Sequence, residues 1–93
     1  MSREVADIVI QERLKELRKV SYEKLVTRMR HPSCESIKGP DGEEYQLEVE
    51  VFWDSKKGED IRVIVAADGG GVSAFKPMCG SFILSPDGSF VSE

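Results

Sequence analysis

EEYQLEVEVFWDSKKGEDIRVIVAA, residues 43–67, contains two runs with different patterns of hydrophobicity. In the first run, residues 45–53, hydrophobic and polar side chains alternate, and only Phe52 breaks the alternation. Successive side chains of a strand point to opposite faces of a sheet, so this run predicts a strand with one buried and one solvated face. The second run, residues 61–67, is hydrophobic at both alternate positions apart from Arg62, which favours a central strand covered on both faces.

The polar residues 54–60 join the two runs and predict an antiparallel hairpin. Pairing across this connection aligns Val51 with Val63 on the buried face. The same register places Phe52 opposite Arg62 on the outer face. A shift by one residue would mix the hydrophobic and polar faces, so the pattern also determines the parity of the register.

Residues 3–30 contain no glycine or proline and are rich in Glu, Lys, Arg, Leu and Ala, a composition typical of helices. Ser21 interrupts the hydrophobic spacing and has the character of an N-cap. We therefore expect two helices, residues 3–19 and 22–30, in preference to one long bent helix. Pro32 ends the helical segment because the residue before a proline is disfavoured in the α region.

Before the hairpin, residues 33–38 predict a short edge strand that pairs with the beginning of the long strand. Residues 39–42, Gly-Pro-Asp-Gly, predict the turn between them, because proline presets φ and glycine accepts a positive φ.

After the hairpin, the three glycines at 69–71 predict a loop, since no Lys-Ser/Thr follows them as in a phosphate-binding loop. Residues 72–76 then predict another strand, which residues 77–80, Pro-Met-Cys-Gly, interrupt. Extended structure resumes at 81–84, and a second Pro-Asp-Gly turn leads into residues 89–91.

These elements predict an α+β fold in which an N-terminal helical segment packs on one face of a four- to five-stranded antiparallel meander sheet. Ninety-three residues are enough for one modest core, so we expect a single domain over residues 1–93. The helical part covers residues 3–30 and the sheet covers residues 33–91.

Composition and charge narrow the possible partners and the location. No apolar run approaches the roughly 18 residues of a membrane helix, and the apolar run at residues 8–10 is too short for a signal peptide. We therefore expect a cytoplasmic protein without membrane contact. Residues 1–31 carry eight Lys/Arg and five Asp/Glu, whereas residues 32–93 carry five and twelve. The acidic sheet disfavours nucleic acid, unless the basic helices alone make the contact.

The residues that could take part in catalysis or metal binding do not form a motif. Zinc needs about four ligands, and the chain has two cysteines and one histidine. We expect reduced, mostly buried thiols at Cys34 and Cys79, no metal or other cofactor, and no catalytic group.

Hydrophobic residues on the outer face of the sheet predict a contact surface. A loop of two or four residues at 68–71 would place Phe75 opposite Ile64 and beside Phe52 and Arg62 on that face. A loop of three residues would instead turn Phe75 toward the core. In a second alternative, the C-terminal segment folds over the patch. The first arrangement gives an exposed hydrophobic patch with a charged rim, as at protein interaction sites.

Two functions follow from these patterns. The first is a non-catalytic interaction or regulatory module that self-associates, or binds another protein, through the outer sheet face or an edge strand. The alternative is a small-ligand-binding protein or minor enzyme with a pocket between the helices and the sheet. Its candidate pocket residues are Tyr45, Trp53, Cys79 and His31.

Overall fold

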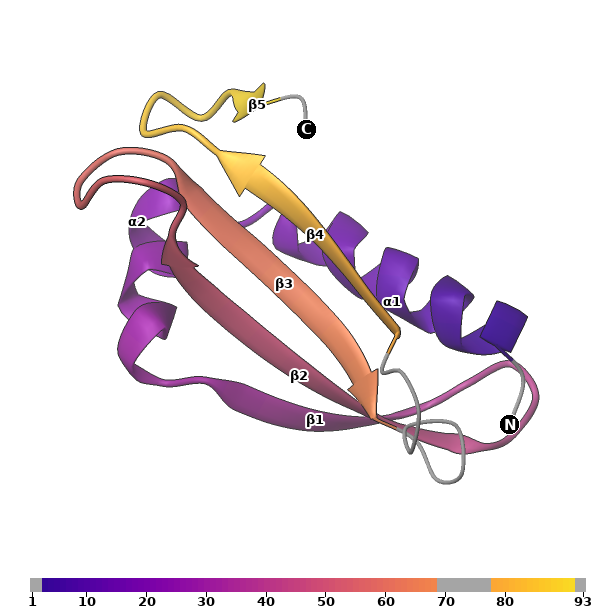
Figure 1. Ribbon diagram of the computed structural model, residues 1–93. Helices are drawn as coiled ribbons and strands as arrows, with labels where there is room; N and C mark the ends of the chain where they lie inside the picture. The colour runs from indigo at the N-terminus through magenta and orange to yellow at the C-terminus, as the bar shows by residue number, and fades with distance from the viewer. Residues whose placement is uncertain (1–2, 69–77, 92–93) are drawn as a thin grey trace.

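The computed structural model of the chain describes residues 3–68 and 78–91. Two α-helices and a 3₁₀ turn precede five strands, which form one antiparallel sheet in the order β1-β2-β3-β4-β5 (Figure 1). The predicted α+β class and the meander are therefore confirmed. The elements are α1 (Arg3–Leu17), α2 (Tyr22–Thr27), η1 (Arg28–Arg30), β1 (Ser33–Lys38), β2 (Glu44–Trp53), β3 (Ile61–Asp68), β4 (Met78–Leu84) and β5 (Phe90–Val91).

The hairpin of β2 and β3 has the predicted register. Val51 lies opposite Val63, and Phe52 lies opposite Arg62. Along β2, buried and exposed side chains alternate up to Phe52, so one face is covered and the other is solvated. β3 lies between β2 and β4, and the outer-face side chains of Arg62, Ile64 and Ala66 are half-buried. This greater coverage confirms the prediction of a central strand.

The hydrophobic core lies between the helices and one face of the sheet, which we call the inner face. Helix α1 runs across this face, and α2 lies at the end where β2 turns into β3 (Figure 1). The helices contribute Ala6, Val9, Ile10, Leu14, Leu17 and Leu25. The strands contribute Tyr45, Leu47, Val49, Val51, Ile61, Val63, Val65, Ala67, Phe82 and Leu84.

The helical segment divides in two, as predicted. After α1, the amides of Lys19 and Val20 bond to carbonyls three residues back, which tightens and ends the helix. The Ser21 hydroxyl accepts the amide of Lys24 at 3.4 Å and caps α2. Both α-helices are shorter than predicted, because α1 stops at Leu17 and residues 28–30 form a 3₁₀ turn.

Strand β4 corrects one prediction. The sequence predicted a break at residues 77–80, whereas β4 runs without interruption from Met78 to Leu84. The glycine in this strand allows close packing: a Cβ at Gly80 would lie 2.7 Å from Leu14 Cδ1 and 3.1 Å from Ile10 Cγ2. Gly80 therefore marks the point where α1 approaches the sheet backbone. The glycine loop and the strand predicted at 72–76 lie outside the described residues.

The two Pro-Asp-Gly turns are built in the same way. Gly42 and Gly88 have φ of 83° and 91°, a region that glycine enters without steric cost. The Asp41 carboxylate accepts the amide of Glu43 at 3.1 Å, and the Asp87 carboxylate accepts the amide of Ser89 at 2.9 Å. The Ser89 hydroxyl bond and this amide bond lower the pKa of Asp87. The turns therefore form from local side-chain chemistry, as predicted.

Polar and aromatic contacts attach α1 to both edges of the sheet. At β1, Nε and Nη2 of Arg13 donate to Glu35 Oε1 at 3.2 and 3.0 Å, which compensates a carboxylate on the inner face. At the other edge, the Arg18 guanidinium lies 5.2 Å from the centroid of the Phe82 ring. Phe82 also meets Phe90 of β5 edge-to-face, with the ring centroids 5.7 Å apart. The helix is thus held at β1 and at β4–β5.

Candidate functional site

A row of side chains crosses the outer face of the sheet from β2 to β5. The strand register aligns Phe52, Arg62, Ile83 and Val91 in successive pairs. Phe52 is 40% exposed and Val91 is 37% exposed, whereas Ile83 between them is only 5% exposed. With Ile64 on β3, these four residues form a surface that we call the outer patch.

The charge within the outer patch is compensated by its neighbours. Arg62 Nε donates to Asp54 Oδ1 at 3.0 Å, and Arg62 Nη1 donates to Ser81 Oγ at 3.4 Å. The guanidinium is therefore oriented along the sheet and paired with a carboxylate. Its aliphatic stem is left to cover hydrophobic neighbours, as long cationic side chains commonly do.

Three of the four residues predicted for the interface lie in this patch. Phe52, Arg62 and Ile64 share the outer face. The predicted pairing of Ile64 with Phe75 is wrong, because Ile64 lies opposite Ser81 of β4. Phe75 itself lies outside the described residues.

Ile83 and Val91 belong to the patch although sequence reasoning did not select them. Residues 82–84 are hydrophobic at every position, so alternation gives no indication of which side chain faces outward. Their faces follow only from the register with β3, which starts at Met78. That starting point depends on the packing of α1 against Gly80, which is tertiary information.

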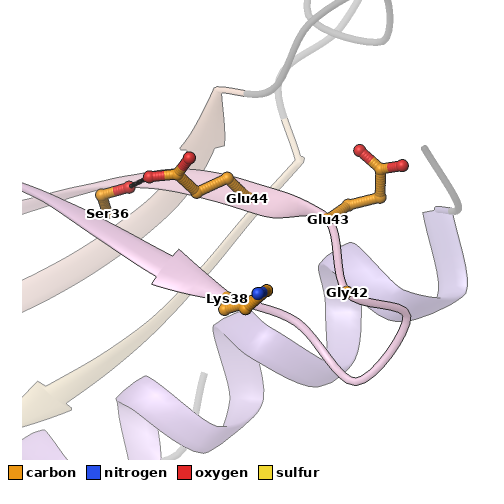
Figure 2. Close-up of a pocket in the computed structure, with 5 residues that line it drawn as sticks. All are labelled: Ser36, Lys38, Gly42, Glu43 and Glu44. Atoms are coloured by element: carbon orange, nitrogen blue, oxygen red, sulfur yellow. Dashed lines mark hydrogen bonds between the residues drawn. The ribbon is translucent and has the colours of Figure 1, made fainter.

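Apart from Phe52, the part of the outer face formed by β1 and β2 is mostly polar. A hollow of about 630 Å³ lies beside the turn of this hairpin and is lined by Ser36, Lys38, Gly42, Glu43 and Glu44. Figure 2 shows the Ser36 hydroxyl bonded to the Glu44 carboxylate, while the Glu43 carboxylate points away from that pair. The polar groups do not converge on one point, so this hollow lacks the arrangement expected of a ligand site.

The two cysteines lie in one row of the outer face. Cys34 pairs with Glu48, Glu48 with Ala66, and Ala66 with Cys79. Three strand spacings separate the thiols by about 14 Å, well beyond the reach of a disulfide. Both thiols are free and exposed, so the prediction that they are mostly buried is wrong: each lies on the outer face of the sheet, which the helices do not cover.

Two of the four predicted pocket residues meet in one cavity. A cavity of about 470 Å³ lies between the helical segment and the β2–β3 connection, and His31 and Trp53 both line it. We call it the basic cleft, and its lining consists of Val26, Thr27, Met29, Arg30, His31, Trp53 and Lys57. It lies between helices and sheet, where the sequence predicted a pocket.

Tyr45 and Cys79 lie elsewhere. Tyr45 is fully buried in the core, and its hydroxyl donates to Asp41 Oδ2 at 2.7 Å. This bond lowers the pKa of Asp41 and holds the first Pro-Asp-Gly turn against the core. Cys79 is exposed on the outer face. Tyr45 is therefore a structural residue, and the four predicted pocket residues do not form one site.

Within residues 3–68 and 78–91, no three His, Cys, Asp or Glu side chains are grouped to hold a metal ion. In the same part of the chain, no helix has the length and hydrophobicity to cross a membrane. Comparison with family models, curated proteins and solved structures found no significant match.

Proposed function

We propose that this chain is a non-catalytic interaction module that self-associates through the outer patch. The observation that supports this most directly is the exposure of two large hydrophobic side chains, Phe52 and Val91, at opposite ends of one row. Hydrophobic side chains gathered in this way favour a protein partner, because covering them removes apolar surface from water.

The order of residues in the row suits a second copy of the chain. The row spans about 14 Å, and its midpoint lies between Arg62 and Ile83. A twofold axis parallel to the strands through this midpoint would stack two sheets face to face. Phe52 of each copy then covers Val91 of the other, and each Arg62 lies over Ile83 of the other, which keeps the two guanidinium groups apart.

The acidic residues of the outer face agree with this arrangement. Glu44, Glu48 and Glu50 all lie on β2, the strand that carries Phe52, and Glu50 lies opposite Ile64. The same twofold axis places β2 of each copy over β5 of the other, so the two β2 strands lie about three strand spacings, or about 14 Å, apart. The carboxylates of the two copies are thereby separated, so their repulsion does not oppose the contact.

Sedimentation velocity at tens of micromolar tests the proposal. We expect the wild type to be a dimer and Phe52→Glu to be a monomer, because a charge would enter the hydrophobic row. Ile8→Glu is the matched control: Ile8 is 48% exposed but lies on α1, outside the patch, so this variant is expected to remain a dimer. A monodisperse wild-type monomer would refute the proposal, and a dimer that survives Phe52→Glu would place the contact elsewhere.

We also propose a reducing, cytoplasmic environment for the chain. Its support is that Cys34 and Cys79 are both free and too far apart to pair. In such a compartment both thiols persist on the outer face without oxidation.

A further inference from the structure

The basic cleft has a hydrophobic floor. Val26, Met29 and Trp53 are half-buried and pack against the core on one side. Their remaining surface lines the cavity. Trp53 has the parity of the inner face and lies opposite Ile61, so the cleft is on the other side of the sheet from the outer patch.

The rim of the cleft carries two cations, Arg30 and Lys57, together with His31. Arg30, His31 and Lys57 are exposed around the hydrophobic floor, and none of the described lining residues is acidic. Neither Arg30 nor Lys57 forms an ion pair with a carboxylate in the described part of the chain. Residues 24–34 include three Lys/Arg and no Asp/Glu, although the whole chain has a net charge of −4. The lining of the cleft is thus positive on an acidic protein, and the three carboxylates of residues 54–60, the connection that carries Lys57, do not line it.

The two walls of the cleft are tied together. The Tyr22 hydroxyl of α2 donates to the Glu59 carbonyl oxygen in the β2–β3 connection. Within that connection, the amide of Glu59 bonds to the Lys56 carbonyl at 3.2 Å, and Gly58 has a φ of 87°. Lys57 is therefore carried on a closed turn that is fastened to the helical wall, and the cleft forms without a ligand.

We propose that the basic cleft binds a small aromatic molecule that carries a carboxylate or phosphate group. Its ring contacts Trp53 and Met29, since aromatic and thioether groups both favour aromatic partners. Its anionic group lies at Arg30 and Lys57, where charge-assisted hydrogen bonds hold it. The cavity volume of about 470 Å³ falls within the range of about 300–1,000 Å³ found for small-molecule sites.

Charge and shape together favour an aromatic anion over an inorganic anion or a neutral aromatic molecule. An inorganic anion would leave the hydrophobic floor in water, and a neutral aromatic molecule would leave the cations without a counter-charge. Only a molecule with both groups satisfies the floor and the rim at once. The proposal does not depend on self-association, because the cleft and the outer patch share no residue.

NMR titration tests the proposal with 2-naphthoate as the probe and its neutral analogue 2-naphthamide as the control ligand. Trp53 is the sole tryptophan, so its indole N–H gives one resonance that reports on the cleft. We expect 2-naphthoate to shift this resonance and the amides of residues 27–31 and 57 at millimolar concentrations. The neutral amide is expected to bind at least tenfold more weakly, because it lacks the charge that Arg30 and Lys57 attract.

Charge reversal supplies the matched variants. Lys57→Glu is expected to weaken 2-naphthoate binding about tenfold, since one attraction is replaced by a repulsion. Lys56→Glu makes the same change at an exposed neighbour that does not line the cleft. It is expected to weaken binding by less than about twofold, because a solvated charge without direct contact to the ligand interacts with it only weakly. Equal effects of both variants, equal affinity for both ligands, or an unmoved Trp53 resonance would each overturn the proposal.

Discussion

Replacing Gly80 with alanine adds one methyl group where α1 crosses β4. The new Cβ would lie 2.7 Å from Leu14 Cδ1 and 3.1 Å from Ile10 Cγ2, whereas carbon atoms in contact are normally about 3.5–4.0 Å apart. Leu14 and Ile10 are both fully buried, so neither can move aside into solvent. The backbone at Gly80 does not have a positive φ, so the contact with α1 alone determines the effect.

The magnitude follows from two opposing terms. Overpacking of a core costs about 1–3 kcal/mol. Alanine restricts the unfolded chain more than glycine does, and this raises the free energy of unfolding by about 0.4–1 kcal/mol. We therefore expect Gly80→Ala to lower the free energy of unfolding by about 1–2 kcal/mol.

Urea unfolding followed by Trp53 fluorescence measures this change, and thermal unfolding provides a check at about 4–8 °C per kcal/mol. A double-mutant cycle with Leu14→Ala identifies the cause, because the truncated side chain leaves room for the new methyl group. In that background Gly80→Ala is expected to be neutral or stabilising. If Gly80→Ala alone were as stable as the wild type, the close approach of α1 to β4 would be refuted.

Two further predictions concern a turn and the outer face. The Tyr45 hydroxyl bond lowers the pKa of Asp41 from 3.8, so its contribution to stability is complete above pH 3.8 and is lost as the pH falls through the lowered pKa. In Tyr45→Phe, NMR titration is expected to show the pKa of Asp41 rising toward 3.8, and an unchanged pKa would contradict this. A bismaleimide with a spacer of about 14 Å should link Cys34 to Cys79 within one chain, whereas mild oxidation should not. Mass spectrometry distinguishes these products, and an intrachain disulfide would show that the register across the sheet is wrong.

The hairpin of β2 and β3 could be predicted because its hydrophobic pattern also determines how the two strands are aligned. Hydrophobic alternation along β2 identifies the covered face, and the polar connection of residues 54–60 aligns Val51 with Val63. The Pro-Asp-Gly turns could be predicted equally well, because their hydrogen bonds form between residues close in the sequence. Where local chemistry decides the structure, the sequence was sufficient.

Strand β4 shows where local reasoning fails. Proline, cysteine and glycine at residues 77–80 suggest an interruption, yet β4 already includes residues 78–80. Gly80 is compatible with the strand because it makes room for Leu14, a residue 66 positions earlier in the sequence. The misplaced start of β4 led to the wrong partner for Ile64 and hid the position of Ile83 on the outer face.

The basic cleft could be predicted from the sequence only in part. Trp53 and His31 stood out as single residues of their kinds, and the structure places both at one cavity. Arg30 and Lys57 were not selected, because each is one of several cations in a polar stretch. Their convergence requires the contact between Tyr22 and Glu59, which joins segments 37 residues apart. Such a contact leaves no periodic signal in the sequence.

The cluster of Arg18, Phe82 and Phe90 has a consequence for the order of folding. It joins the end of the first helix to the last strand, across 72 residues from Arg18 to Phe90. Contacts between residues so far apart in the sequence have a high entropic cost of loop closure. This cost is offset only when the intervening chain has already folded. We therefore expect these contacts to form late in folding. The hairpin of β2 and β3 is expected to form earlier, and the two ends of the chain then pack against it.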